Sequence, residues 1–263
     1  MVKHHVLWLG LMTLGACTGG SSTADGPVTL PPVDDLAAPA DLDLRVLSPQ
    51  AQRGLTLSPV PIDTTNMPFD QKESVGMGAY LVAALNCGNC HGAATGAFLS
   101  GGRAFGTVTN PIYARNLTPD PTTGLKLTEA QFIEANRTNK DFVDNGALQT
   151  HPFATYRWMT NYDLQSIYAY LKVIPPVKNQ VMPDMKATPG TPTPSPVSYS
   201  DGDVTRTLPP DGQSDPLGAQ RGLALQPLDN PSGFSFFTDS AKRSFGRGSY
   251  LVTLLGCNNC HTN

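Results

Sequence analysis

Two short segments of the sequence combine residue types and a spacing that can hold a metal cofactor. Each has two cysteines three positions apart, followed at once by a histidine: Cys87, Cys90 and His91 in the first, and Cys257, Cys260 and His261 in the second. This C-x-x-C-H spacing is typical of c-type haem attachment, in which both thiols form thioethers with the porphyrin and the histidine binds iron. The sequence therefore predicts two haem c groups, with His91 and His261 as proximal ligands.

Paired cysteines also occur in thioredoxin-like redox sites and in zinc sites. A thioredoxin-like pair needs no histidine directly after it. A zinc ribbon would require both pairs to share one metal, which would leave each histidine without a role. Only haem attachment uses all three residues of each segment.

The N-terminal residues indicate export from the cytoplasm. Lys3 precedes an apolar run from Val6 to Leu14, which is too short to cross a bilayer as a helix. The run ends in Leu14-Gly15-Ala16-Cys17, which resembles the lipobox of bacterial lipoproteins. We therefore expect residues 1–16 to be a lipoprotein signal peptide and a lipid on Cys17 to anchor the protein to a membrane, facing the periplasm. An ordinary secretory signal with an incidental Cys17 is the alternative, and it also places the chain outside the cytoplasm.

The sequence around the two C-x-x-C-H segments, which we call the first and second pentads, repeats. Gly78-Ala79-Tyr80-Leu81-Val82 matches Gly248-Ser249-Tyr250-Leu251-Val252, and Arg53-Gly54-Leu55 matches Arg221-Gly222-Leu223. Such self-similarity indicates two copies of one haem module. The expected organisation is a tether over 17–50, a first haem domain over 51–178, a Pro-rich linker over 179–220, and over 221–263 the start of a second domain. Because Asn263 follows His261 by two residues, we expect this second copy to be incomplete at its C-terminus.

The predicted secondary structure is helical. Apolar residues at helical spacing precede both pentads, ending at Leu85 and Leu255. Thr128 with Gln131, and Thr160 with Asp163, are start signals for two further helices. The first should continue to about Arg137, and the second should stop before Pro175. These elements predict a small all-α, haem-centred domain, and the 25 glycines and 24 prolines argue against long sheets.

The charge balance excludes one class of partner. With 18 basic and 21 acidic residues, the chain lacks the cationic excess that neutralises phosphates. We therefore expect no nucleic-acid binding.

Several segments resemble multihaem class I cytochromes c. They are Tyr113-Ala114-Arg115-Asn116-Leu117-Thr118-Pro119-Asp120, Thr123-Gly124-Leu125, Asp163-Leu164, Ile167-Tyr168-Ala169-Tyr170-Leu171 and Pro175-Pro176-Val177. The chain is most similar to the cytochrome subunits of membrane-bound alcohol and aldehyde dehydrogenases and related bacterial lipoprotein cytochromes. The resemblance covers about residues 53–177 and begins again at Arg221.

This resemblance implies a non-enzymatic carrier of single electrons, without catalytic residues of its own. Its partners would be a dehydrogenase, other cytochromes or a terminal oxidase. It also implies that the helix before the pentad crosses the last helix, with Gly78 and Tyr80 meeting the face of Ala169-Tyr170-Leu171. Arg115 and Arg137 would be counter-charges to the haem propionates, or ordinary surface arginines.

The sixth iron ligand of the first haem stays open between two residues. The related cytochromes have a Met-Pro-aromatic stretch where this chain has His151-Pro152-Phe153, and Met159 follows shortly after. A thioether from Met159 would raise the potential, whereas an imidazole from His151 would lower it. Met182 and Met185 are weaker candidates in the linker.

A dihaem enzyme, such as a peroxidase or a substrate dehydrogenase, is the alternative function. In that case one iron would lack a sixth protein ligand and would bind a small molecule. No paired carboxylates or Arg-His cluster for acid–base chemistry accompany either pentad, which favours the electron carrier.

Overall fold

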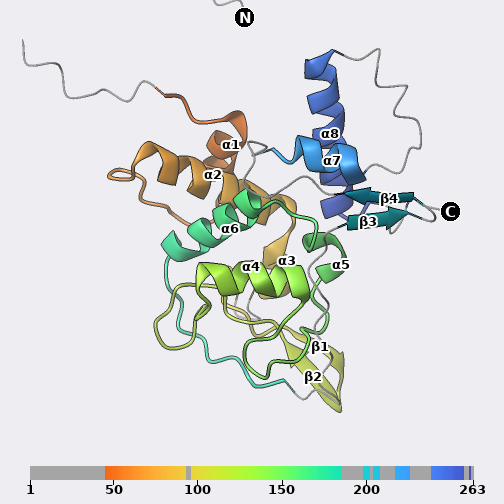
Figure 1. Cartoon of the computed structure of the whole chain (residues 1–263). Coiled ribbons are helices and arrows are strands. Elements are labelled where there is room, and N and C mark those ends of the chain that lie inside the picture. The colour runs from red at the N-terminus through yellow and green to blue at the C-terminus, as the bar shows by residue number, and fades with distance from the viewer. Residues whose placement is uncertain are drawn as a thin grey trace, which may run out of the picture. The chain divides into compact units, whose positions relative to one another are not determined.

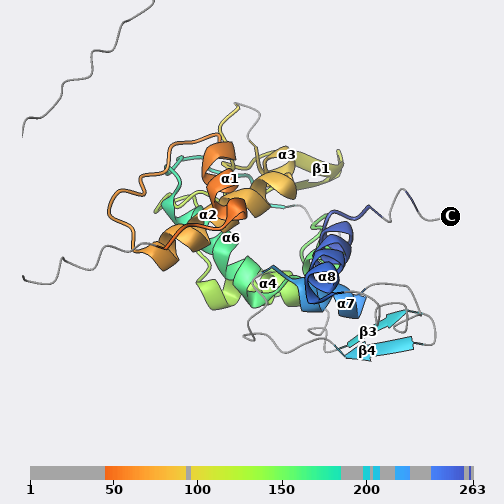
Figure 2. The same cartoon turned by 90° about the horizontal axis from the view of Figure 1, so that it is seen from above.

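The computed structural model describes residues 45–92, 96–184, 198–201, 204–207, 217–225, 238–257 and 261, with the backbone alone for residues 198–201 and 204–207 (Figures 1 and 2). The predicted signal peptide, Cys17 and the tether up to residue 44 lie outside these ranges. So do Met185, much of the predicted linker, and Cys260. Within the described ranges, no helix combines the length and the hydropathy needed to cross a bilayer.

Helices dominate the described residues. They are α1 (Pro49–Leu57), α2 (Phe69–Ala84), α3 (Cys87–His91), α4 (Glu129–Thr138), α5 (Phe153–Tyr156), α6 (Asn161–Val173), α7 (Ala219–Leu225) and α8 (Asp239–Leu254). Two antiparallel hairpins accompany them: β1 (Ala104–Thr107) with β2 (Asn110–Tyr113), and β3 (Ser198–Asp201) with β4 (Val204–Thr207). The predicted helical architecture is confirmed, with the correction that two short hairpins, which the sequence did not predict, are added to it.

The two helices with sequence start signals begin where those signals placed them. At the start of α4, the Thr128 hydroxyl accepts a hydrogen bond from the Gln131 N–H, and the Gln131 side chain accepts one from the Thr128 N–H. At the start of α6, the Thr160 hydroxyl accepts from the Asp163 N–H at 3.1 Å. These bonds satisfy N–H groups that have no partner inside the helix.

Helices α2 and α6 cross at a glycine, as the resemblance implied. A Cβ added at Gly78 would overlap the carbonyl oxygen of Ser166 and lie 2.8 Å from the Tyr170 Cβ. The absence of a side chain therefore lets the two backbones touch. The backbone and Cβ of Tyr80 lie over Gly54 of α1. This crossing fixes the direction in which α2 runs toward the first pentad.

The helix pair α7–α8 has the same glycine contacts as the pair α1–α2. A Cβ on Gly54 would overlap the carbonyl oxygen of Gly76, and a Cβ on Gly222 would overlap that of Gly246. At Gly248, which matches Gly78, no described atom lies within 4 Å of an added Cβ. The two pairs therefore share their internal packing, while the surroundings of the second helix differ.

Buried polar contacts join α7 and α8 to the start of α6. The Tyr250 hydroxyl donates to the Asp163 carboxyl at 2.6 Å and accepts from the Thr160 N–H at 2.9 Å. Arg221, which is 3% exposed, donates to the backbone oxygen of Met159 at 2.8 Å. Tyr250 and Met159 belong to one hydrophobic core. These contacts bring the C-terminal end of α8 to the pocket that the first pentad lines.

Candidate haem-binding site

The first pentad forms its own short helix directly after α2. Asn86 has a left-handed backbone (φ 54°), a conformation that asparagine tolerates better than most residues, and this turns the chain from α2 into α3. The Gly92 N–H closes the turn on the Gly88 carbonyl at 2.8 Å. As a result Cys87, Cys90 and His91 lie on one turn and line the same cavity.

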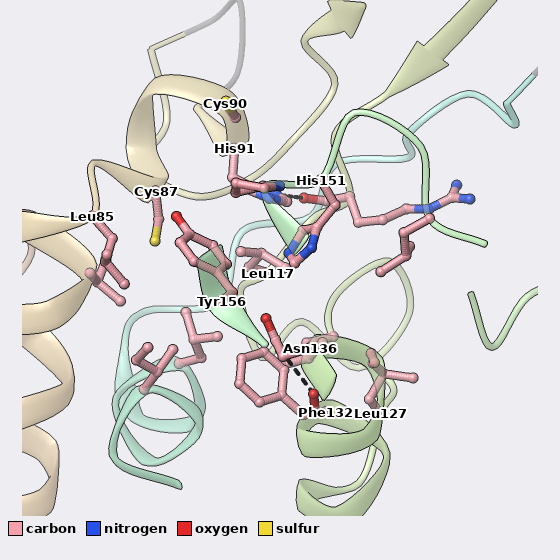
Figure 3. A pocket seen from close by; sticks show the side chains of 18 of the residues that line it. Leu85, Cys87, Cys90, His91, Leu117, Leu127, Phe132, Asn136, His151 and Tyr156 are labelled. Carbon is pink, nitrogen blue, oxygen red and sulfur yellow. Dashed lines mark hydrogen bonds between the residues drawn. The ribbon is translucent and has the colours of Figure 1, made fainter. Parts of the chain in front are cut away.

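This cavity has a volume of about 720 Å³. Its size is within the range of about 300–1,000 Å³ that is usual for sites holding small molecules and cofactors. Figure 3 shows the two cysteines and His91 on one side, and around the remainder apolar side chains together with those of Asn136, His151 and Tyr156. The main apolar residues are Leu85, Leu117, Leu125, Leu127, Phe132, Ile167 and Leu171. A largely apolar cavity with two thiols and an imidazole at its wall fits a covalently held porphyrin.

The His91 ring is oriented by a backbone oxygen. Its Nδ1 lies 2.9 Å from the carbonyl oxygen of Arg115, and because a carbonyl can only accept, Nδ1 donates. This tautomer leaves Nε2 as the atom that could bind a metal. Burial lowers the pKa of His91, partly offset by the bond to Arg115, so the ring stays neutral as a metal ligand requires.

The segment that carries this carbonyl is itself held in place. Asn116, only 3% exposed, donates through Nδ2 to the Val177 carbonyl at 2.8 Å, and its Oδ1 accepts from the Thr118 N–H at 3.0 Å. A buried polar residue that satisfies several partners fixes one conformation. The resemblance had pointed to this segment, and its role here is to place the Arg115 carbonyl against His91.

The Cys87 thiol has a neighbour that the sequence did not predict. Burial raises the pKa of Cys87 to about 12. Tyr156 on α5 lines the same cavity, and Figure 3 shows its side chain near that of Cys87. Burial and the neighbouring cysteines raise the pKa of Tyr156. Nothing in the local sequence marks Tyr156, because its place near Cys87 depends on the tertiary fold.

The two candidates for the sixth ligand occupy different environments. His151 lines the cavity, and in Figure 3 its side chain points toward His91. Met159 is 0% exposed, belongs to the hydrophobic core, and does not line the cavity. The structure thus brings His151 together with Cys87, Cys90 and His91, and places Met159 elsewhere.

The two arginines considered as counter-charges also differ. Arg115 lines the cavity, and its guanidinium lies 2.9 Å from Asp184 and 3.6 Å from Asp141. Arg137 is 6% exposed, donates to the Arg157 carbonyl at 2.7 Å, and does not line the cavity. Arg115 therefore reaches the site, whereas Arg137 holds the backbone between α5 and α6.

The residue before the second pentad has the same left-handed backbone conformation as the residue before the first. Gly256 has a left-handed φ of 63° directly before Cys257, in the position that Asn86 occupies before Cys87. The His261 N–H donates to the Cys257 carbonyl at 3.1 Å. Leu254, Leu255 and Gly256 line the cavity of the first pentad. The second pentad thus begins at the wall of the first cavity.

With this geometry established, comparison with known proteins defines a class: the chain is similar to cytochrome c subunits of dehydrogenases. It is 30% identical over 190 residues, 72% of its length, to the cytochrome c subunit of the quinone-dependent alcohol dehydrogenase of Gluconacetobacter polyoxogenes. It is 29% identical over 194 residues (73%) to the fructose dehydrogenase cytochrome subunit of Gluconobacter japonicus. It is 28% identical over 192 residues (72%) to the gluconate 2-dehydrogenase cytochrome c subunit of Pantoea cypripedii.

The chain spans only 36%, 35% and 38% of the lengths of these three relatives. No family model matches the chain. The resemblance inferred from the sequence is confirmed by these comparisons.

Proposed function

We propose that this chain is a c-type cytochrome that carries single electrons between extracytoplasmic redox partners. The observation that carries the proposal is the convergence of Cys87, Cys90 and His91 on one apolar cavity. Bound haem would supply the reversible one-electron couple of its iron. The thiols of Cys87 and Cys90 would hold it covalently, and Nε2 of His91 would bind the iron.

The surrounding residues have roles that follow from their contacts. The Arg115 carbonyl fixes the His91 tautomer, and a hydrogen bond to a ligand imidazole raises its basicity. Apolar side chains such as Leu117 and Phe132 limit the access of water, which tunes the potential of an iron centre. The bond from His91 to Arg115 and the packed apolar lining suit electron transfer, because they would keep the iron site rigid while the charge of the iron changes.

A second haem at Cys257, Cys260 and His261 is part of the proposal. It is supported by the glycine contacts that the pairs α1–α2 and α7–α8 share, and by the left-handed residue that precedes each pentad. The two stretches would then be copies of one module, the first a haem-centred class I cytochrome c domain.

The names of the relatives suggest the partner. Since the three relatives are cytochrome subunits of dehydrogenases, we propose that a dehydrogenase delivers electrons to this chain. Other cytochromes or a terminal oxidase would accept them. Haem attachment to C-x-x-C-H segments and the lipobox-like Leu14–Cys17 support a periplasm-facing location with a lipid anchor on Cys17.

The test is haem content in a host that matures c-type cytochromes. The mass of the matured protein, corrected for the lipid on Cys17, should exceed that of the polypeptide 17–263 by two haems. Cys87→Ser/Cys90→Ser and Cys257→Ser/Cys260→Ser should each lose one haem, while Cys17→Ser should keep both and lose membrane association.

Wild-type protein with unmodified thiols and no porphyrin mass would refute the proposal. Loss of haem from only one of the two double variants would reduce it to a single site. A high-spin iron spectrum that changes on addition of peroxide would favour the dihaem enzyme.

A further inference from the structure

His151 is held in the first cavity by an unusual backbone. The preceding residue, Thr150, has a left-handed φ of 59°, a strained conformation that is rare for a β-branched side chain. The His151 carbonyl then accepts from the Phe153 N–H at 2.7 Å, as the chain enters α5. The backbone is therefore strained at the turn that places the His151 side chain in the cavity.

The His151 ring is packed but has an unmet bonding requirement. It lies edge-on to the Tyr156 ring, with 5.4 Å between centroids and an angle of 82°. Its Nδ1 is buried and has no hydrogen-bond partner among the described residues. A buried polar atom without a partner is destabilising, so a ring left in this state indicates a bound group or a function.

Met159 makes its contacts outside the cavity. Its side chain is 0% exposed within the core, and its backbone oxygen accepts the bond from Arg221. The next residue, Thr160, begins α6 and is also bound by the Tyr250 hydroxyl. Bringing the Met159 sulfur into the cavity would require the start of α6 to be rebuilt.

We propose that His151 would bind the iron of the first domain together with His91. This inference rests on the proposed function, since it requires a haem attached at Cys87 and Cys90. Two imidazole ligands make this site low-spin and of lower potential than a histidine–methionine site.

The test uses the full chain in a Cys257→Ser/Cys260→Ser background, so that the spectra report the first haem alone. Near-infrared magnetic circular dichroism of the oxidised protein should show two nitrogen ligands. Met159→Leu, the matched control at the other candidate, should leave this spectrum unchanged. His151→Met should add a sulfur-to-iron charge-transfer band and shift the midpoint potential upward. His151→Ala should become high-spin and return to low-spin on addition of imidazole.

A sulfur ligand in the wild-type spectrum that Met159→Leu abolishes would overturn the inference. So would an unchanged low-spin spectrum in His151→Ala. If His151→Ala fails to fold, the wild-type, Met159→Leu and His151→Met spectra still decide between the two ligands. Absence of haem from the parent protein would instead refute the proposed function.

Discussion

Gly78→Ala is expected to destabilise the protein by about 2 kcal/mol or more, although alanine favours helices. The added methyl group would meet the Ser166 carbonyl oxygen, which belongs to the backbone of α6 and cannot rotate away. Overpacking of this kind costs typically about 1–3 kcal/mol and occasionally more, and the better helix propensity returns only about 1 kcal/mol. We expect the cost to lie at or above the upper end, because α2 and α6 must move apart.

Gly248→Ala is the matched control, since Gly248 holds the same position in the repeated sequence. An added methyl group meets no described atom within 4 Å there. This variant should be stabilised by about 0.5–1 kcal/mol through helix propensity alone. Urea unfolding of the haem-loaded chain, followed by far-ultraviolet circular dichroism, measures both. Equal effects of the two substitutions would show that the α2–α6 crossing does not depend on Gly78.

The second large effect is expected for Tyr250→Phe, at about 3 kcal/mol. The lost hydroxyl donates to Asp163 at 2.6 Å and accepts from Thr160 at 2.9 Å, and Tyr250 and Asp163 are both 0% exposed. Burial and the Asp163 carboxyl raise the pKa of Tyr250 well above its usual value, so the hydroxyl remains a donor. Hydrogen bonds to charged groups contribute about 1.5–3 kcal/mol, and partners left buried add to the loss.

Tyr80→Phe is the control for this substitution. Tyr80 occupies the matching place in the first copy, is half-buried, and its hydroxyl bonds to none of the described residues. It should change the unfolding free energy by no more than about 0.5 kcal/mol. Hydrogen exchange should show α8 amides less protected in Tyr250→Phe and unchanged in Tyr80→Phe. Equal exchange in both variants would contradict the role given to Tyr250.

The sequence was informative where the signal is local. The order of Cys87, Cys90 and His91 matches the spacing typical of porphyrin attachment, so the proposed site could be recognised without a structure. Thr128 and Thr160 mark helix starts because the bonds they make reach only three residues along the chain. The two helix starts were predicted correctly for that reason.

The sequence was not informative where the position of a side chain depends on contacts between segments that are far apart in the chain. His151 and Met159 are both chemically suited to bind iron. What separates them is the turn at Thr150 and the bond from Arg221, which lies 62 residues beyond Met159. Asp163 looked like part of a helix start, yet its carboxyl accepts from Tyr250, 87 residues away. The hairpin of β1 and β2 was missed, although Gly106, with a φ of 83°, and Asn110-Pro111 are turn-forming residues.

The position of Leu254 and Gly256 at the wall of the first cavity has a thermodynamic consequence. A group that fills this cavity as far as Leu254 and Gly256 would touch the end of α8, so its non-covalent packing in the cavity and the attachment of α8 to the rest of the fold are linked equilibria. Linkage is reciprocal: the free energy by which such packing favours a docked α8 equals the free energy by which a docked α8 favours the packing. Loosening α8 would therefore weaken the non-covalent packing of the group by the same factor.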